Sequence, residues 1–362
     1  MRTIKVLFLT NGLGLGNSTR CHAIIQRLHA SGARVEVVTS GNGLWYFSDK
    51  IEVSDVHEIQ PLAYGTKDGA ISITRTFTSI AGMVGIFRRN AKKIGNILDE
   101  RRPDVVVIDS DYNFLPVKHR KIPIAALNNA DVVWNSYFQF KDRPHSIRAQ
   151  FFGVEVLDYW FHKLIPDQVL SPCLDPRVPQ SGGNILRIGP IVRQVYKASL
   201  QTRPPARATV MLSGSVFGTP VNFNRSTYPV QIDVIGRECP EGWSEKQEVT
   251  FHGKIKDTYP LLKNSDVAVV NGGFSAVSEM FAMKKPLVVV PVPNHAEQWI
   301  NARTIEHLGL GLIATQMNYE EVMLQAVDRI EEFRAGYAKL DKMEDGAAQA
   351  SQAILAMATR KS

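Results

Sequence analysis

The sequence predicts an α/β protein with two doubly wound, Rossmann-like domains that face each other across a cleft. Short apolar runs of strand length alternate with amphipathic helical segments along most of the chain. The length of 362 residues is long for one core and favours two domains of roughly 150–190 residues each. The alternation stops once, in a Lys-, Arg-, Thr- and Pro-rich stretch, and then restarts. We therefore predict an N-terminal domain over residues 1–195, a linker over 196–207 and a C-terminal domain over 208–362, with the last helix able to pack back on the first domain.

The first domain opens with a βαβ unit. The apolar run Lys5–Thr10 predicts a buried parallel strand, Ser18 begins a helix that Gly32 ends, and Arg34–Thr39 predicts the next strand. A right-handed crossover places the first turn at the carboxyl edge of the sheet. Further strands are expected at 104–109, 122–127 and 184–189, and residues 164–180 are expected to form a loop.

The second domain repeats the alternation. Strands are expected at 208–213, 230–235, 249–251, 266–270, 286–291 and 311–314. Helices are expected at 257–264, 275–283, 297–308 and 319–333, and a final alanine-rich helix at about 345–358.

The composition and net charge of the chain limit the kinds of molecule that it is expected to bind. A net charge of +7 suits nucleic acid, an anionic membrane surface or an anionic substrate. The chain has none of the usual nucleic-acid modules, so we exclude nucleic acid. Basic residues cluster at 88–93, after the apolar stretch 80–87, and two interpretations of that helix stay open: a core helix with a solvated end, or a helix that contacts a membrane surface.

The cellular location follows from what the sequence lacks. Three cysteines without metal-like spacing, no signal-peptide pattern and no apolar run of about 18 residues predict a cytoplasmic protein. The alternative that the basic helix adds is a protein peripheral to the inner face of the membrane. No histidine pattern predicts a metal site.

The most informative turn is Asn271-Gly-Gly-Phe-Ser-Ala-Val-Ser-Glu279, directly after an apolar strand. Its two glycines let the backbone approach a ligand. A helix opening at Ser275 offers unpaired N–H groups and a partial positive charge, which suit a diphosphate. Glu279 lies on the same helix face as Ser275, where a carboxylate can accept hydrogen bonds from ribose hydroxyls. Taken alone, the same residues fit a plain helix cap equally well.

The following strand-to-helix turn favours the ligand site, because it carries the polar pair Glu297-Gln298 beside His295. Two more turns at the same edge belong to this set. Ser213, Gly214 and Ser215 end a strand with small residues that leave room for a diphosphate, and the backbone of Lys254 and Ile255 can pair with a base edge.

The first turn, Asn11 to Arg20, is rich in glycine but does not match the dinucleotide fingerprint. We expect Gly14 and Gly16 to bring the backbone close to a ligand, with Asn17 and Arg20 projecting from the helix start. Arg20 could neutralise a phosphate or a carboxylate there, and the competing interpretation is a surface arginine.

Asp109 and Asp111 follow another strand as a D-x-D pattern, a short motif that binds metal-bridged diphosphates in some sugar transferases. A carboxylate at the carboxyl edge of a parallel sheet can act as a general base when its surroundings tune its pKa. Ordinary loop capping by the two carboxylates is the alternative.

These residues together resemble the GT-B glycosyltransferases, especially the group of the peptidoglycan N-acetylglucosaminyltransferase and the enzymes that glycosylate lipids and natural products. The resemblance runs from about Ala208 to Leu312 and includes Gly272-Gly273-x-Ser275-x-x-x-Glu279, Lys285-Pro286, Glu297-Gln298 and Asn301. The first half matches more loosely, through Gly14 to Arg20 and the turn at Asp109.

The resemblance implies a role for each matched residue. Gly272, Gly273, the Phe274 backbone and Ser275 would hold the donor diphosphate, with Ser213–Ser215 facing it. Glu279 would bind the ribose, and Glu297 and Gln298 the sugar hydroxyls. The implied enzyme inverts the anomeric centre of a UDP-sugar, needs no metal or other cofactor, and transfers the sugar to a lipid-linked or small-molecule acceptor.

The chain departs from the family pattern at one position, and this difference leaves the identity of the catalytic base open. Many relatives carry histidine where this chain has Asn17, and an amide does not accept a proton near neutral pH. The candidates are then Asp109 or Asp111, with His295 next, while Asn17 orients the acceptor. A nucleotide-sugar hydrolase of the same fold, a chain that has lost activity and a non-catalytic subunit of a membrane glycosyltransferase complex remain the alternatives.

Overall fold

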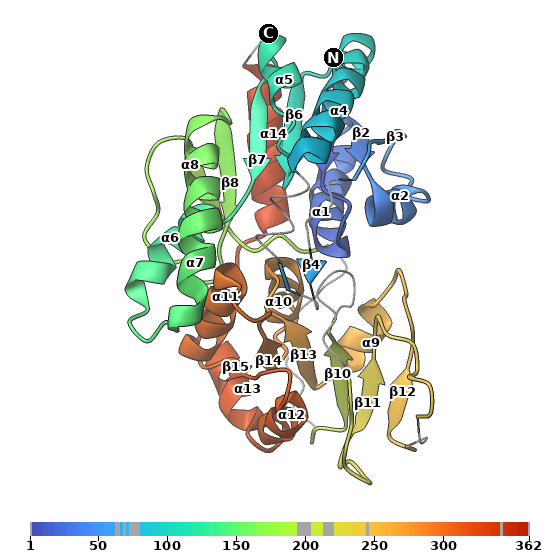
Figure 1. Ribbon diagram of the computed structural model, residues 1–362, viewed down its shortest axis with the longest axis vertical. Coiled ribbons are helices and arrows are strands. Elements are labelled where there is room, and N and C mark those ends of the chain that lie inside the picture. Colours follow the sequence, from blue (N-terminus) through green and yellow to red (C-terminus); the bar gives the residue numbers. More distant parts are fainter. Residues whose placement is uncertain are drawn as a thin grey trace. The chain divides into compact units, whose positions relative to one another are not determined.

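The computed structural model of the protein describes residues 2–61, 66–67, 70–71, 80–193, 204–212, 221–243, 246–340 and 343–360. These residues form two compact units (Figure 1). The first unit contains residues 1–141, 152–193 and 344–362, and the second contains residues 142–151 and 194–343. Of the predicted linker, 204–207 are described, and Arg207 already begins a strand.

The first unit is built on a parallel sheet in the order β3-β2-β1-β6-β7-β8-β9. Its strands are β1 (Lys5–Thr10), β2 (Arg34–Thr39), β3 (Asp55–Glu58), β6 (Val105–Asp109), β7 (Ile124–Leu127), β8 (Gln168–Pro172) and β9 (Ile185–Ile188). β4 (Thr66–Lys67) and β5 (Ala70–Ile71) form a separate antiparallel pair. The direction of strand addition reverses between β1 and β6, so the sheet is doubly wound as the sequence predicts.

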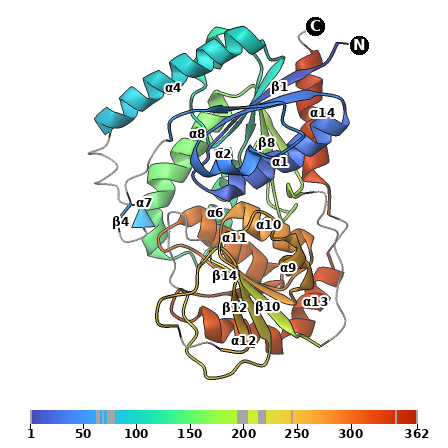
Figure 2. The same ribbon diagram turned by 90° about the vertical axis from the view of Figure 1, so that its right-hand side faces the viewer.

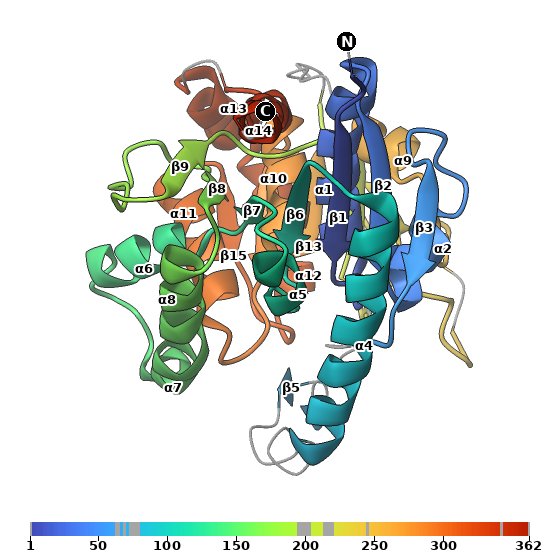
Figure 3. The ribbon, with the colours of Figure 1, turned by 90° about the horizontal axis from the view of Figure 1, so that it is seen from above.

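Helices cover both faces of this sheet (Figure 3). They are α1 (Leu15–Ala30), α2 (Gly41–Phe47), α4 (Ile80–Arg101), α5 (Leu115–His119), α6 (Ala130–Gln139), α8 (Val156–Leu164) and α14 (Gly346–Thr359). Successive side chains of β1 point to opposite faces of the sheet, so alternate residues pack against different layers of helices. Val6 and Phe8 pack with α1 and α14, whereas Leu7 and Leu9 pack with α4, α5 and α8.

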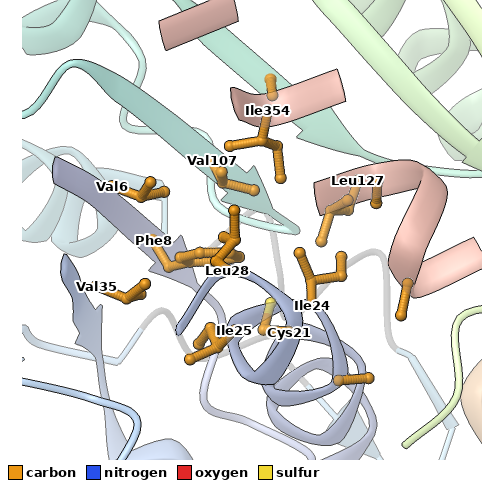
Figure 4. Packing of buried hydrophobic residues seen from close by; sticks show 14 of the residues in the cluster. Val6, Phe8, Cys21, Ile24, Ile25, Leu28, Val35, Val107, Leu127 and Ile354 are labelled. Atoms are coloured by element: carbon orange, nitrogen blue, oxygen red, sulfur yellow. The ribbon is translucent and has the colours of Figure 1, made fainter. Parts of the chain in front are cut away.

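The C-terminal helix α14 belongs to the first unit, although the predicted C-terminal domain includes its residues. It runs beside α1 (Figure 2), and Ile354 joins the same core as Ile24 and Leu28 (Figure 4). Asp345 caps the helix by accepting a hydrogen bond of 3.0 Å from the Ala348 amide. At Gly346 an added Cβ would lie 1.9 Å from the Gly189 carbonyl oxygen, so only glycine permits this approach.

The basic helix predicted from residue 80 onward is α4. Ile94, Ile97 and Leu98 are buried in the core, while Arg88 and Lys92 are exposed. This packing agrees with the core-helix interpretation, and membrane contact by the same helix stays a prediction. Within the described residues, no helix is both long enough and apolar enough to cross a membrane.

The second unit also has a parallel sheet, in the order β12-β11-β10-β13-β14-β15. The strands are β10 (Arg207–Met211), β11 (Gln231–Val234), β12 (Val249–Phe251), β13 (Val267–Asn271), β14 (Leu287–Val290) and β15 (Gly311–Ile313). The order again reverses at the first strand, between β10 and β13. Each of the six strands was predicted, with end points within two residues where the ends are described.

The helices of the second unit are α9 (Tyr259–Asn264), α10 (Phe274–Ala282), α11 (Ala296–His307), α12 (Tyr319–Asp328) and α13 (Ile330–Ala338). α12 and α13 pack on one face of the sheet with Val269 and Val288. Ala268 and Val270 point to the other face and are fully buried, and α10 and α11 contact the strands there. Residues 142–151 add the turn η1 (His145–Ile147) and α7 (Arg148–Gln150), and the π-helical turn η2 (Phe151–Glu155) follows.

Three expectations from the sequence are wrong. The segment 164–180, expected to be a loop, contains β8. The predicted helix 319–333 is two helices that meet at Arg329. The helix expected to begin at Ser18 begins three residues earlier, at Leu15, with Gly14 as its N-cap. The helices expected from Ser275 and Glu297 begin one residue earlier, at Phe274 and Ala296, which is within the usual variation of helix ends.

Candidate functional site

The turn between β13 and α10 lies at the carboxyl edge of the second unit's sheet, next to the point where the strand order reverses. Gly273 is the N-cap of α10 and has no side chain to occupy the first-turn amides, which have no acceptor inside the helix. A Cβ added at Gly273 would meet no described atom within 4 Å. The turn therefore places the first-turn N–H groups of α10 at the positive end of a helix dipole.

The next strand-to-helix turn is bonded directly to this one. Asn271 Nδ2 donates to the Val290 carbonyl at 3.0 Å, and Asn301 Nδ2 donates to the Gly272 carbonyl at 2.9 Å. A Cβ at Gly272 would lie 2.5 Å from the Gln298 carbonyl oxygen. The two turns that the sequence grouped by their polar residues therefore lie side by side.

Two of the predicted donor residues lie on α10, one helical turn apart. Glu279 is buried and Ser275 is half-buried nearer the start of the helix. Phe274 has its side chain in the core, so only its backbone can serve a ligand. The first turn of α10 therefore carries a hydroxyl, and the next turn carries a carboxylate.

The start of α11 carries His295, Glu297 and Gln298. Gln298 is buried, and its Oε1 accepts a hydrogen bond of 3.0 Å from the Val292 amide, which leaves its Nε2 as the donor for a ligand. His295 is the N-cap and follows Asn294, whose φ is 62°. Burial lowers the pKa of His295, against an opposing effect of Glu297, so the imidazole is neutral near pH 7.

Two contacts of α11 with the inserted segment 142–151 were not predicted. Gln150 Oε1 accepts the first-turn amide of Ala296 at 2.9 Å. Asp142 of the same inserted segment pairs with Arg303 at 2.7 Å. The two contacts join residues more than a hundred positions apart, and nothing in the local sequence signals them.

The other residues predicted to bind the donor follow two other strands of the second unit. Lys254 is exposed and Ile255 is half-buried. Both follow β12, the strand at the far end of the sheet from β15, after Gly253 with φ 60°. Ser213, Gly214 and Ser215 lie outside the described residues.

In the first unit the turns after β1 and β6 are joined, also where the strand order reverses. The Asn11 amide donates to the Asp109 carbonyl at 3.1 Å, and Asn11 Nδ2 donates to the Ser110 carbonyl at 3.2 Å. Gly14 is the N-cap of α1, Gly16 is exposed in its first turn and Asn17 is half-buried. The predicted acceptor-side residues are thus brought to one edge of the sheet.

Arg20 binds Asp109. Its Nε donates to Oδ2 at 3.0 Å, its Nη2 donates to Oδ1, and Nη2 also lies 3.5 Å from Asn17 Oδ1. Cys21 donates to the same carboxylate at 3.3 Å, and burial followed by the nearby Asp109 charge raises the pKa of this thiol well above its usual value. The carboxylate that Arg20 neutralises therefore belongs to the protein itself.

Asp111 has a different environment. It is buried, and its Oδ1 accepts from the Asn113 amide at 2.8 Å and from Asn113 Nδ2 at 3.0 Å. None of the described residues donates a hydrogen bond to its Oδ2. Burial raises the pKa of Asp111 in spite of the two hydrogen bonds. Of the two carboxylates, Asp111 has the geometry of a base and Asp109 that of a counter-ion.

A polar network at the turns after β6 and β7 was not predicted from the sequence. Asp158 on α8 accepts from Tyr112 Oη and from Asn128 Nδ2, each at 2.8 Å, and lies 3.2 Å from His162 Nδ1. Burial alone would raise the pKa of Asp158, but His162, Tyr112 and Asn128 together lower it. The ionised carboxylate ties α8 to the turns after β6 and β7. Only the spacing of Asp158 and His162 could have suggested it.

Among the described residues, three potential metal-ligand atoms gather only at Glu36, Asp55 and His57. Arg101 pairs with Glu36 at 3.4 Å and with Asp55 at 2.9 Å, and Arg34 adds a second guanidinium. The negative charge of this cluster is therefore met by protein cations, and the D-x-D carboxylates do not belong to it.

Comparison with known proteins agrees with this arrangement. Residues 4–157 match the glycosyl transferase family 1 model, and residues 239–355 match the model of the glycosyltransferase family 28 C-terminal domain. An uncharacterized glycosyltransferase of Methanosarcina acetivorans is 24% identical, over 94% of this chain and 93% of that protein.

Two further proteins extend the comparison. The UDP-N-acetylglucosamine–N-acetylmuramyl-(pentapeptide) pyrophosphoryl-undecaprenol N-acetylglucosamine transferase of Clostridium novyi is 20% identical, over 92% of both chains. Among solved structures, the spinosyn forosaminyltransferase SpnP superposes with a TM-score of 0.63 at 12% identity, over 98% of this chain and 96% of that one. At this identity the likeness is one of fold.

Proposed function

Because the chain belongs to the glycosyltransferases of GT-B fold, with family 1 and family 28 domains in its two halves, we propose that it is an inverting, metal-independent transferase. It moves a sugar from a nucleoside diphosphate sugar, a UDP-sugar, to a hydroxyl of a lipid-linked or small-molecule acceptor. The observation that carries the proposal is the N-terminus of α10 at the carboxyl edge of the sheet, with Gly273 at its cap and the α11 turn bonded beside it. The name of the Clostridium novyi relative states a UDP-sugar donor and an undecaprenol-linked acceptor, which supports these two classes of substrate.

On the donor side, the first-turn amides of α10 and the hydroxyl of Ser275 hold the diphosphate. Glu279 accepts hydrogen bonds from the ribose hydroxyls. Glu297 accepts from the sugar hydroxyls, and Gln298 donates through Nε2, because its Oε1 already serves the Val292 amide.

The reaction follows from this assignment. The acceptor hydroxyl oxygen attacks the anomeric carbon, its bond to the sugar forms, and the bond from that carbon to the diphosphate oxygen breaks. The leaving diphosphate gains negative charge, which the amides and the dipole of α10 stabilise without a metal ion. The inverted configuration follows from a single displacement.

The hydroxyl proton passes to Asp111. Its raised pKa makes it a stronger base than an ordinary aspartate, and its Oδ2 accepts from none of the described residues. Asp109 is the weaker candidate because Arg20 donates hydrogen bonds to both of its carboxylate oxygens. Neutral His295 is the other candidate base, and Asn17 orients the acceptor.

The test is a thermal-shift screen of nucleoside diphosphates and their sugars, followed by a transfer assay in EDTA. A UDP-sugar that raises the melting temperature more than other nucleotides, and sugar transfer that persists in EDTA, are the expected results. Donor breakdown at full rate without acceptor would identify a hydrolase instead. Donor binding without turnover on any acceptor would identify a binding subunit.

A further inference from the structure

The turn that carries Asp111 has a backbone conformation that depends on support from its surroundings. Ser110 has a φ of 53°, in the left-handed region that residues other than glycine rarely adopt. Such a conformation persists only where neighbouring contacts hold the chain in place. Asn11 holds the start of the turn, because its amide donates to the Asp109 carbonyl and its Nδ2 donates to the Ser110 carbonyl. The other end of the turn is held through Tyr112.

Helix α8 holds Tyr112 by both its hydroxyl and its ring. Tyr112 Oη donates to Asp158 Oδ1 at 2.8 Å, and the ring packs edge-on against Phe161 with centroids 5.0 Å apart. The next residue, Asn113, donates to Asp111 Oδ1 from its amide at 2.8 Å and from its Nδ2 at 3.0 Å. Tyr112 therefore lies between Asp111 and the residue that orients the Asp111 carboxylate, so a shift of Tyr112 moves both.

The carboxylate of Asp158 is itself held in place by two further donors. Asn128 Nδ2 donates to its Oδ2 at 2.8 Å, and His162 Nδ1, one helical turn along α8, lies 3.2 Å from its Oδ1. Asn128 Oδ1 in turn accepts from the Ala130 amide at 2.6 Å, at the start of α6. Burial alone would raise the pKa of Asp158, but its donors together lower that pKa below the usual value. Tyr112 therefore donates to a charged acceptor in a fixed position, which makes the bond stronger than one between neutral groups.

We propose that Asp158 is a positioning residue for the candidate base Asp111. Through Tyr112 it holds the turn after β6, so that the Asp111 carboxylate keeps one orientation toward the acceptor hydroxyl. The inference rests on the proposed function, because Asp111 is the base only there. Both oxygens of Asp158 already accept hydrogen bonds from the protein, so it acts through Tyr112 and not on the substrate. A base that is displaced by about 1 Å loses much of its effect on the rate.

Tyr112→Phe tests the proposal, because it removes the hydroxyl and keeps the ring that packs on Phe161. The turnover number for sugar transfer is expected to fall about tenfold to a hundredfold, while KM for the donor and the affinity for UDP stay unchanged. The rise of turnover with pH should move to lower pH, because a loosened Asp111 loses part of the burial that raises its pKa. Partial unfolding would lower turnover at every pH without moving this rise.

A second variant and a matched control complete the experiment. Asp158→Asn has a single acceptor oxygen, which cannot replace the two that serve Tyr112 and Asn128, so a similar loss of turnover is expected. The combined loss in Tyr112→Phe with Asp158→Asn should be smaller than the product of the single losses, because both changes break the same hydrogen bond. Tyr228→Phe is the control and should keep the wild-type turnover and pH profile, since Tyr228 Oη donates to Glu320 at 2.7 Å in the second unit.

Wild-type turnover in Tyr112→Phe, a loss of turnover without a shift of the pH profile, or losses that multiply in the double variant would each overturn the proposal. The position of Asp111 can also be measured without turnover. The difference in melting temperature between Asp111→Asn and its parent, followed across pH, reports the pKa of Asp111. Its change with pH should move to lower pH in the Tyr112→Phe background, and an unmoved change would contradict the positioning role. If it moves but the wild type transfers no sugar, the proposed function fails and the positioning role stands.

Discussion

Arg20 and Asp109 form a buried ion pair between α1 and the end of β6. Their side chains are 7% and 0% exposed, and Arg20 Nε donates to Asp109 Oδ2 at 3.0 Å. The pair joins the helix that carries Asn17 to the strand that leads to Asp111. Its effect is to fix two turns of the candidate acceptor side against each other.

Removing one partner of this pair should destabilise the first unit strongly. Arg20→Met leaves the Asp109 carboxylate buried without its cation, and a loss of about 3–5 kcal/mol is expected. Urea unfolding followed by tryptophan fluorescence measures it. The matched control is Arg177→Met, because Arg177 pairs with Asp175 while 64% exposed, and a loss of about 0–1 kcal/mol is expected. Similar losses in the two variants would mean that the Arg20 pair is only a surface-type contact.

The pH dependence of turnover should report Asp111. A base must be deprotonated, so activity is expected to rise with pH through the pKa of Asp111, which burial places above the usual 3.8. Asp111→Asn should abolish turnover and leave UDP affinity intact. Asp99→Asn, at an exposed aspartate that pairs with Arg120, should keep the wild-type profile. If Asp111→Asn turns over normally, the base is another group.

The same pKa shift predicts a change in stability. Because the folded-state pKa of Asp111 is raised, its stabilising contribution is complete below the ordinary aspartate pKa and is lost as pH rises through the raised value. Asp111→Asn removes the buried charge. Its melting temperature relative to wild type should therefore increase from acid toward neutral pH, and a constant difference across pH would contradict the shift.

Glu279 should contribute to donor affinity. Replacing it with alanine removes the carboxylate proposed to accept from the ribose, and a loss of roughly tenfold to a hundredfold in UDP affinity is expected for hydrogen bonds to a charged group. Calorimetry with UDP measures it. Glu321→Ala on the exposed side of α12 is the control and should leave UDP affinity unchanged. If Glu279→Ala binds UDP with unaltered affinity, Glu279 does not bind the ribose.

Most strands could be predicted because they are apolar runs buried on both faces of a parallel sheet, as Val267–Asn271 and Leu287–Val290 are. Two strands of the parallel sheet of the first unit were not. Asp55–Glu58 is a polar, partly exposed edge strand. Gln168–Pro172 is short and ends in proline among other turn residues. Neither segment has the periodicity of a buried strand.

The two turns proposed to hold the donor could be predicted to lie at one edge of the sheet because diglycine, a helix start and nearby polar residues are local in sequence. The contacts within the proposed acceptor side are not local. Arg20 and Asp109 are 89 positions apart, and Tyr112 and Asp158 are 46 apart. Such pairings depend on how strands and helices pack. The sequence therefore predicted Arg20 as a ligand contact and Asp109 as a candidate base, and it could not reveal that the two residues bind each other.

The two adjacent glycines of the donor turn should respond differently to alanine. At Gly272 the added Cβ would lie 2.5 Å from the Gln298 carbonyl oxygen and 2.8 Å from Gln298 Cβ. The bonded turns must then separate, so Gly272→Ala is expected to destabilise the second unit by about 1–3 kcal/mol. Gly273 has φ −63°, which alanine adopts freely, and its Cβ would meet no described atom within 4 Å. The melting temperature of Gly273→Ala should therefore match that of the wild type.

Gly273→Ala should nevertheless weaken binding of the donor, because the added methyl group would occupy the space proposed for the diphosphate. Affinity for UDP is expected to fall at least about tenfold, whereas affinity for uridine, which lacks the diphosphate, should change little. Calorimetry with the two ligands on the same variant separates the contributions. Equal losses for UDP and uridine would point to a general distortion of the site, and an unchanged UDP affinity would place the diphosphate away from the N-terminus of α10.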